Sequence, residues 1–489
     1  MSQYWILAAI VLPVLGGIGI PLIPFRKRPW MLTYIEAVVL LTSGIVGALL
    51  LNGTTETFHV VHFVNDLSIS FKIDGMSMVF AGLVAVLWPL ATLYAFEYMA
   101  HEGHEKTFFM FYTMTYGVTL GIAFASDIMS MYFFYELLTL VTVPLIMHSL
   151  TREAILAVRK YLYFSIGGAA FAMMGMIFVM VYGYTCEFQP GGVFSQIGIL
   201  RHGQILLWIY FFSFIGFGVK AAVWPMSSWL PQAGVAPTPV TALLHAVAVV
   251  NAGAFAIIRL TYYSFGVEFL RDTWVQAVCM GLTMFTIVYG CSRAVKETHI
   301  KRRLAWSTVS NLSYILFGSM IMTPQGLVGA LAHFVFHGFM KITSFLCAGA
   351  FMHQTGKKYV YEMDGMGKHM KIVFGTFGVS ALGLMGVPGF AGFISKWNLA
   401  EAAVESGNAL AWAGVACLLL SALLTAIYML GVVSRAFFPS RRETAMETAA
   451  DPGWQMCLPL LVCAGCSLVL GIWSQPLMDF FRAIAQGML

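Results

Sequence analysis

Long apolar runs separated by short polar segments dominate the 489-residue chain. A helix needs about 20 apolar residues to cross the hydrocarbon core of a bilayer, so runs of that length predict membrane spans. The pattern therefore predicts an all-α polytopic membrane protein with about fourteen transmembrane helices. These lie near residues 4–23, 30–51, 76–98, 108–126, 128–149, 161–184, 204–222, 240–262, 274–294, 304–323, 326–352, 371–396, 409–434 and 454–476.

Two of the predicted spans are interrupted by proline and glycine. The seventh span runs into a segment with Pro225, Pro231 and Pro237, and the twelfth contains Pro388 between two glycines. A broken helix at membrane depth needs protein or water over its backbone, and a matched pair is typical of transporters built from inverted repeats. We expect two inverted five-helix repeats, each with a broken helix. The predicted division is 1–107 (helices 1–3), 108–262 (first repeat), 263–438 (second repeat) and 439–489 (last helix).

The composition agrees with a membrane protein and excludes a soluble one. Hydrophobic residues make up 59% of the chain and charged residues 10%, whereas a soluble domain carries about 25% charged residues. The eight cysteines lie almost wholly in apolar runs. Cys463 and Cys466 form a CxxC pair without a nearby histidine or acidic residue, so helix packing is a better interpretation than a disulfide framework or a zinc site.

The basic residues predict the orientation of the chain in the membrane. If the N-terminus faces out, 19 of the 27 lysines and arginines fall on inward segments and four on outward ones, as the positive-inside rule requires. Basic residues at 26–28 follow the first span as a stop-transfer flank does, so that span is not a signal peptide. We expect a multi-pass protein of the cell (inner) membrane with both termini on the outer, periplasmic side.

Four basic residues remain in or at the edge of spans: Lys220, Arg259, Lys341 and Lys396. Arg259 lies toward the outer end of its span, where its side chain can snorkel to water. Each remaining charge costs about 2.5–3.5 kcal/mol near the bilayer centre, which indicates a function. Glu136 lies mid-span and is either a structural ion-pair partner or the carboxylate that tunes the proton affinity of a lysine.

Histidines accompany these charges. His333, His337 and Lys341 recur every four residues and therefore lie along one helix face, where they could form a proton wire. A metal site and two hydrogen-bonded core histidines are the alternatives, although no HExxH glutamate or other acidic ligand is nearby. His245 either bonds a neighbouring helix or bridges Lys220 and the His337 group.

Five motifs carry a resemblance to a known family. The chain resembles the antiporter-like, proton-conducting subunits of respiratory complex I, with relatives in Mrp-type cation/proton antiporters and membrane-bound energy-converting hydrogenases. The motifs are "YELLTL" at 135–140, "GVKAAVWPMSSWLPQAGVAPTPVTALLHA" at 218–246, "IKRRLAWSTVSNLSYILFG" at 300–318, "HFVFHGFMKITSFL" at 333–346 and "GVPGFAGFISKW" at 386–397.

The resemblance implies fourteen helices, two inverted five-helix repeats and a proton relay across them. Several family members have a lysine where this chain has Asn251, so the central relay is expected to use His245 and Lys341. In the first half, the relay would comprise the ion pair of Glu136 and Lys220. The central axis would comprise His245, His333, His337 and Lys341, and the second half would contribute Lys396.

The sequence therefore predicts a proton-translocating subunit of a larger membrane complex, without redox chemistry or a cofactor of its own. Its partners would be other membrane subunits, the bilayer, and protons or sodium, but not nucleic acid. The alternative is a stand-alone secondary transporter that binds a small solute or cation at the broken helices. An intramembrane enzyme is disfavoured, because no nucleophile and base occur at a usable spacing.

Overall fold

The computed structural model describes residues 3–53, 56–63, 68–438 and 449–487, and most of them form long helices. A short antiparallel hairpin, which the sequence pattern did not predict, pairs β1 (Phe58–His62) with β2 (Ser68–Phe71). The α-helices are α1 (Tyr4–Leu22), α2 (Arg28–Asn52), α3 (Gly75–Tyr98), α4 (Glu105–Phe124), α5 (Ile128–Ile146), α6 (Arg152–Tyr182), α7 (Gln196–Gly218), α8 (Trp229–Ala233), α9 (Thr238–Ala246), α10 (Val249–Arg259), α11 (Val267–Leu270), α12 (Trp274–Lys296), α13 (Ile300–Ile321), α14 (Pro324–Thr355), α15 (Lys371–Met385), α16 (Ala391–Glu405), α17 (Ala409–Phe437), α18 (Trp454–Ile472) and α19 (Gln475–Gln486).

The expectation of an all-α polytopic membrane protein is confirmed. Among the described residues, 12 helices are long and apolar enough to cross a membrane. The two other predicted spans are occupied by α13, which carries several polar residues, and by the pair α15 and α16, of 15 residues each. The count of fourteen crossings and the inverted relation of the two repeats stay predictions.

Helix starts follow ordinary capping chemistry. Asp74 caps α3 by accepting a hydrogen bond from the Ser77 amide, and Asp127 caps α5 in the same way through Ser130. Burial raises the pKa of the Asp127 carboxyl, although hydrogen bonds from Ser70 and Ser130 oppose this effect. Such caps satisfy backbone N–H groups that would otherwise face an apolar environment.

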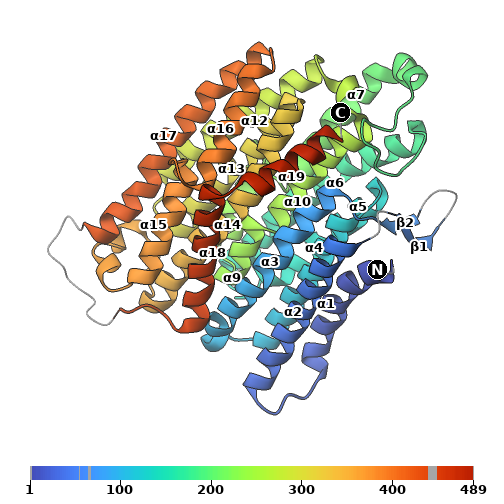
Figure 1. Ribbon diagram of the computed structural model, residues 1–489. Coiled ribbons are helices and arrows are strands. Elements are labelled where there is room, and N and C mark those ends of the chain that lie inside the picture. The colour runs from blue at the N-terminus through green and yellow to red at the C-terminus, as the bar shows by residue number, and fades with distance from the viewer. Residues whose placement is uncertain (1–2, 54–55, 64–67, 439–448, 488–489) are drawn as a thin grey trace.

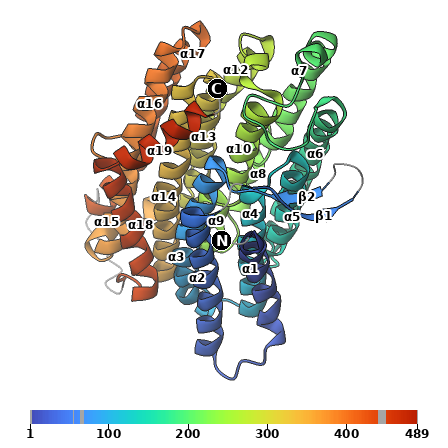
Figure 2. The same cartoon turned by 45° about the vertical axis from the view of Figure 1, so that its right-hand side comes forward.

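Helix α14 forms the centre of the bundle. Its most apolar window is entirely buried, and it contacts α3, α9, α13, α15, α16, α18 and α19. In Figure 2, α6 and α7 lie on one side of the molecule and α15, α16 and α17 on the other, with α14, α9 and α10 between them. The helix that carries His333, His337 and Lys341 is therefore shielded from lipid.

Both predicted helix breaks are present. Helix α7 ends at Gly218, and the chain reaches α9 through turns, a 3₁₀ segment at Met226–Ser228 and the short α8. Helix α15 ends at Met385, and α16 begins at Ala391 after a turn. Pro225 precedes the 3₁₀ segment, Pro231 lies in α8, and Pro237 is the N-cap of α9.

The two faces of the bundle differ in charge. The connection from α1 to α2 carries the predicted inward residues Arg26, Lys27 and Arg28, and the α14–α15 connection carries Lys357 and Lys358. We call this side the basic face; Arg441 and Arg442, also predicted to lie there, are outside the described residues. In Figure 1, α1 begins near the β-hairpin, and α19 ends at the end of the bundle that is opposite the α1–α2 connection.

The C-terminal region differs from the predicted single span at 454–476. Helix α18 ends at Ile472, and the separate helix α19 lies obliquely across the bundle in Figure 1. Its buried residues are Met478, Phe481, Ile484 and Ala485. Ile484 packs on Gly75 of α3, where a β-carbon would lie 2.6 Å from the isoleucine side chain.

The expectation that Arg259 snorkels to water is wrong. Its side chain is 1% exposed and forms two hydrogen bonds with Asp74, Nη1 to Oδ2 at 2.6 Å and Nη2 to Oδ1 at 2.7 Å. Burial alone would raise the pKa of the Asp74 carboxyl, but the Arg259 guanidinium holds it below its usual value. The pair ties the start of α3 to the end of α10.

Replacing Asp74 by asparagine should therefore destabilise the protein. Removing one member of a buried ion pair leaves the other charge uncompensated and costs about 3–5 kcal/mol. The matched control is Asp364→Asn, which removes the exposed pair with Arg435 at 3.4 Å and should cost about 0–1 kcal/mol. Thermal unfolding of the purified protein in detergent measures both variants. Equal midpoints for the two variants would contradict a structural role of the Asp74–Arg259 pair.

Candidate functional site

Lys220 lies directly after the end of α7, in the turn that begins the break. Its side chain is 1% exposed. The ammonium donates a hydrogen bond to the backbone carbonyl of Tyr135 in α5 and lies 3.4 Å from the centroid of the Tyr135 ring. A carbonyl dipole and an aromatic face both stabilise a buried cation without neutralising it.

The predicted Glu136–Lys220 ion pair is not formed as a direct contact between these two described residues. The lysine binds the carbonyl of Tyr135, one residue before Glu136, and Glu136 Oε1 is buried without a hydrogen-bond partner in the protein. The Lys220 ammonium therefore binds α5 one residue before Glu136, but it forms no direct ion pair with the Glu136 carboxyl group. The reason is geometric, because the Tyr135 carbonyl and ring take up the ammonium.

The position of Lys220 depends on a close approach by α10. A β-carbon on Gly253 would lie 2.4 Å from the Ala221 backbone nitrogen and 2.9 Å from the Lys220 carbonyl carbon. Only glycine lets the two backbones approach this closely. The sequence analysis did not select Gly253, because nothing in a single glycine within an apolar run marks such a contact.

His245 lies fully buried at the end of α9, with its ring centroid 4.7 Å from that of Phe345 in α14. Neither ring nitrogen has a hydrogen-bond partner among the described residues. The helix is interrupted at Val247 and Ala248 before α10 begins, whereas the sequence predicted a continuous span. Asn251 compensates by donating from Nδ2 to the Ala246 carbonyl at 3.0 Å.

Helix α14 presents the predicted row of titratable side chains. The rings of His333 and His337 are stacked with centroids 5.9 Å apart, and all three residues of the row are fully buried. Lys341 Nζ donates to Ser307 Oγ at 2.6 Å and to the Leu304 carbonyl at 3.2 Å. Within the part of the chain that the structure describes, both ring nitrogens of His337 lack a hydrogen-bond partner.

Helix α13 supplies polar groups that the sequence analysis missed. Asn311 Oδ1 lies 3.2 Å from His333 Nε2, and Asn311 Nδ2 donates to the Ser307 carbonyl at 2.7 Å. Tyr314 places its ring 5.1 Å from that of His333. Ser307, Asn311 and Tyr314 are spaced at i, i+4 and i+7, so a polar stripe on an apolar helix was the available signal.

The row continues into α16. His333 Nδ1 lies 2.9 Å from Ser395 Oγ, and the next residue, Lys396, donates to the carbonyls of Leu384 at 2.6 Å and Met385 at 3.2 Å. These are the last carbonyls of α15, which have no partner within that helix. The second break, with Pro388 between two glycines of positive φ, therefore provides the acceptors for Lys396.

The structure thus brings five of the predicted residues into one buried zone and leaves two in another. Hydrogen bonds connect Lys341, Ser307, Asn311, His333 and Ser395 across α14, α13 and α16, and they end beside Lys396. His337 and His245 lie next to this row. Lys220 and Glu136 lie at α7 and α5, and the contact of Gly253 with the lysine turn is what joins them to α10.

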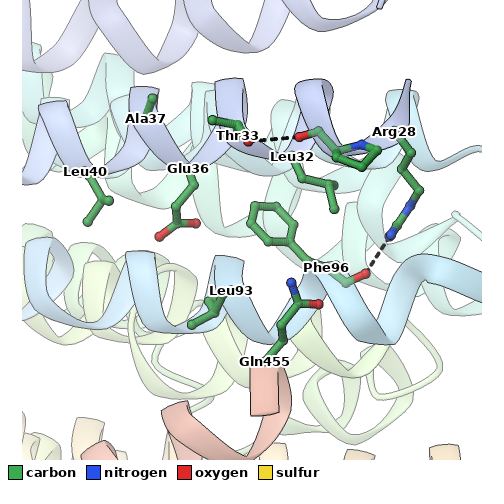
Figure 3. Close-up of a pocket in the computed structure, with 10 residues that line it drawn as sticks. Arg28, Leu32, Thr33, Glu36, Ala37, Leu40, Leu93, Phe96 and Gln455 are labelled. Atoms are coloured by element: carbon green, nitrogen blue, oxygen red, sulfur yellow. Dashed lines mark hydrogen bonds between the residues drawn. The ribbon is translucent and has the colours of Figure 1, made fainter. Parts of the chain in front are cut away.

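A further groove lies away from the predicted site residues. It has a volume of about 560 Å³ between α2, α3 and the start of α18. Figure 3 shows Glu36 extending into it from α2, with Leu93 and Phe96 of α3 opposite and Arg28 bonded to the Phe96 carbonyl. None of the predicted site residues lines this groove.

Comparisons with known proteins match most of the chain to one family. The family model described as "NADH:quinone oxidoreductase/Mrp antiporter, TM" matches residues 125–425. A second, described as "NADH-Ubiquinone oxidoreductase (complex I), chain 5 N-terminus", matches residues 62–109. The first match contains all seven predicted relay residues.

Individual relatives agree with these matches. NADH-quinone oxidoreductase subunit N from Desulforudis audaxviator is 26% identical over 98% of both chains. A Na(+)/H(+) antiporter subunit from Alkalihalophilus pseudofirmus is 30% identical over 69% of this chain and 43% of its own. The Mrp complex from a Dietzia species contains a chain of the same fold, with a TM-score of 0.85 at 20% identity over 100% of this chain and 98% of that one. The chain belongs to the NADH:quinone oxidoreductase/Mrp antiporter family and is an antiporter-like membrane subunit of that family.

Proposed function

We propose that this chain translocates protons as the non-redox subunit of a multisubunit membrane complex. The observation that carries the proposal is the buried row from Lys341 through Ser307, Asn311 and His333 to Ser395, beside Lys396. Groups that can gain and lose protons alternate there with hydroxyl and amide groups. Such a row, with water where ring nitrogens lack protein partners, is a path for protons through a membrane.

The lysines of the path are held in a way that suits a change of charge. Lys220, Lys341 and Lys396 all donate to backbone carbonyls, and none is paired with a carboxylate in the described structure. A fixed counter-charge would favour the ammonium permanently. A neutral carbonyl stabilises the ammonium less, so each lysine can release its proton at a smaller cost.

Glu136 acts on the first of these lysines in the proposed mechanism. Its carboxyl group follows the carbonyl that binds Lys220, and its buried oxygen is free to accept a hydrogen bond. A small movement of the lysine from the Tyr135 carbonyl toward Glu136 would form the ion pair and raise the proton affinity of the lysine. The return movement would lower it.

The assembly and the orientation follow from the family and the charge pattern. Relatives are named as subunits of NADH-quinone oxidoreductases and of a Na(+)/H(+) antiporter, so we propose other membrane subunits as partners and sodium as a second transported ion. The protein would lie in the cell (inner) membrane with the basic face toward the cytoplasm. A single central solute pocket is disfavoured, because the predicted residues are spread over α5, α9, α14, α16 and the turn after α7.

Replacing Lys220 by arginine should block translocation while leaving assembly intact. Arginine stays charged at any accessible pH, so it can still donate to the Tyr135 carbonyl but cannot pass a proton on. We expect proton uptake into vesicles, with the reconstituted complex running its driving reaction, to fall at least about ten-fold. The control is the same substitution at exposed Lys296. Near-normal uptake by Lys220→Arg would show that Lys220 is only a fixed positive charge.

Replacing Asn311 by leucine should interrupt the row at its centre. The variant loses the acceptor for His333 and the donor to the Ser307 carbonyl but keeps a similar volume. Proton uptake in the same vesicles should drop about ten-fold, as loss of a transfer partner implies. Asn398→Leu is the matched control, because Asn398 is a buried asparagine of α16 outside the row. If both variants pump equally well, protons take another path.

A reporter fused after Leu489 should report the outer, periplasmic side. The expectation rests on the concentration of basic residues on the opposite face of the bundle. The measurement compares a periplasm-active enzyme with a cytoplasm-active fluorescent protein at the same junction. Activity of the cytoplasmic reporter would contradict either the orientation or the even number of crossings.

A further inference from the structure

A polar cavity opens at the basic face, away from every residue of the proposed relay. It has a volume of about 350 Å³ between the ends of α3, α5 and α14 and the starts of α9 and α13. Its walls carry a carboxylate, two imidazoles, two ammonium groups and a phenol: Glu102, His148, His353, Lys301, Lys358 and Tyr98. Carboxylate and imidazole groups can gain and lose protons near neutral pH.

The wall of the cavity is continuous with the central helix. His353 lies on the same four-residue repeat of α14 as Lys341, with Phe345 and Gly349 between them. The ring of Phe345 packs at a tilt against the ring of His245, and a β-carbon on Gly349 would lie 2.2 Å from the Thr238 side chain. Helix α14 therefore runs from the cavity to the relay with α9 packed closely against it.

A pair of hydroxyl groups lies between the cavity and α9. Thr238 Oγ1 donates a hydrogen bond to the Tyr98 hydroxyl at 3.2 Å, and the Tyr98 ring lies 5.5 Å from the ring of His353. Thr238 and His245 are seven residues apart in α9, which puts them on the same face two turns apart. The hydroxyl pair thus leads from the cavity along α9 toward the ring nitrogens of His245, which have no protein partner.

Among the described residues, the charged groups that line the cavity form no direct ion pair, although the Glu102 carboxylate is nearby. Lys301 is 3% exposed and donates to the Ala236 carbonyl at 2.7 Å. Burial lowers the pKa of His148, and nearby Glu102 partly opposes this effect. Lys301 therefore resembles the lysines of the proposed relay, because its ammonium donates to a backbone carbonyl. A lysine held in this way can change its charge more easily than a lysine in an ion pair.

We propose that this cavity is the port through which protons pass between water at the basic face and the central axis. The port leads to His245 by way of Tyr98 and Thr238, and not to the Glu136–Lys220 end of the relay. The proposal rests on the proton-translocating function proposed above. A chain of two hydroxyls passes protons but offers too few oxygen ligands for a dehydrated cation, which takes about six.

Single-hydroxyl variants test the port. Tyr98→Phe removes the acceptor for Thr238 and keeps the ring, and Thr238→Val removes the donor with nearly the same shape. We expect each to slow proton uptake by the reconstituted complex about ten-fold, and Thr238→Ser, which restores the hydroxyl, to match the parent. The matched control is Tyr94→Phe, because Tyr94 lies one turn away in α3 and donates to the Leu346 carbonyl outside the cavity.

Thiol labelling tests access to the cavity independently of catalysis. Met352 lines the cavity without belonging to the hydroxyl pair, so Met352→Cys introduces a thiol on its wall. A charged, membrane-impermeant thiol reagent applied at the basic face should modify this cysteine, as peptide mass spectrometry reports, and should slow uptake several-fold relative to the treated parent. Modification from the opposite face alone, or modification without slowing, would overturn the port.

Lys220→Ala, measured in the same vesicles, separates the two proposals. If Lys220→Ala stops uptake while Tyr98→Phe and Thr238→Val pump at the parental rate, the port is wrong and the proposed function stands. If Lys220→Ala pumps normally, the proposed function itself fails. Slow uptake by Tyr94→Phe equal to that of Tyr98→Phe would also overturn the port, because packing of α3 would then explain the effect.

Discussion

The cost of placing a positive charge inside a membrane protein governs how this chain is built. Lys220, Lys341, Lys396 and Lys301 are buried or nearly so, and each ammonium donates to a backbone carbonyl. Arg259, by contrast, is bound by both oxygens of a carboxylate. The chain thus uses arginine where a permanent charge ties helices together, and lysine where the proposed relay and port need a charge that can change.

Carbonyl acceptors for these lysines depend on where helices stop. The end of α15 leaves the Leu384 and Met385 carbonyls for Lys396, and the loop before α9 leaves the Ala236 carbonyl for Lys301. Lys220 is different, because its ammonium binds the carbonyl of Tyr135 inside another helix, α5. At the break itself, the carbonyl of the preceding residue, Val219, accepts a hydrogen bond from Trp229. A break therefore either supplies an acceptor directly or frees the lysine to reach one on another helix.

Local features of the sequence predicted the long helices, the two proline or glycine breaks and the titratable row on α14, because hydrophobic length, proline and four-residue spacing act within one segment. Contacts between segments were less predictable. Asp74 and Arg259 are 185 residues apart, and neither flanking sequence identifies the other. The interruption at Val247 contains no proline or glycine, so only the packing around Asn251 and Gly253 accounts for it.

The polar groups of the core form two kinds of path. From Lys341 to Ser395, each group has a hydrogen-bond partner in the protein, so a proton can move there by small rearrangements of existing bonds. His245 and His337 have no such partner among the described residues, and a buried imidazole without a protein partner needs water to supply one. In the proposed relay, proton transfer through His245 and His337 therefore depends on hydration. Since α9 ends and α10 begins beside His245, a small movement of that break would change the hydration and place control of the path at the centre of the molecule.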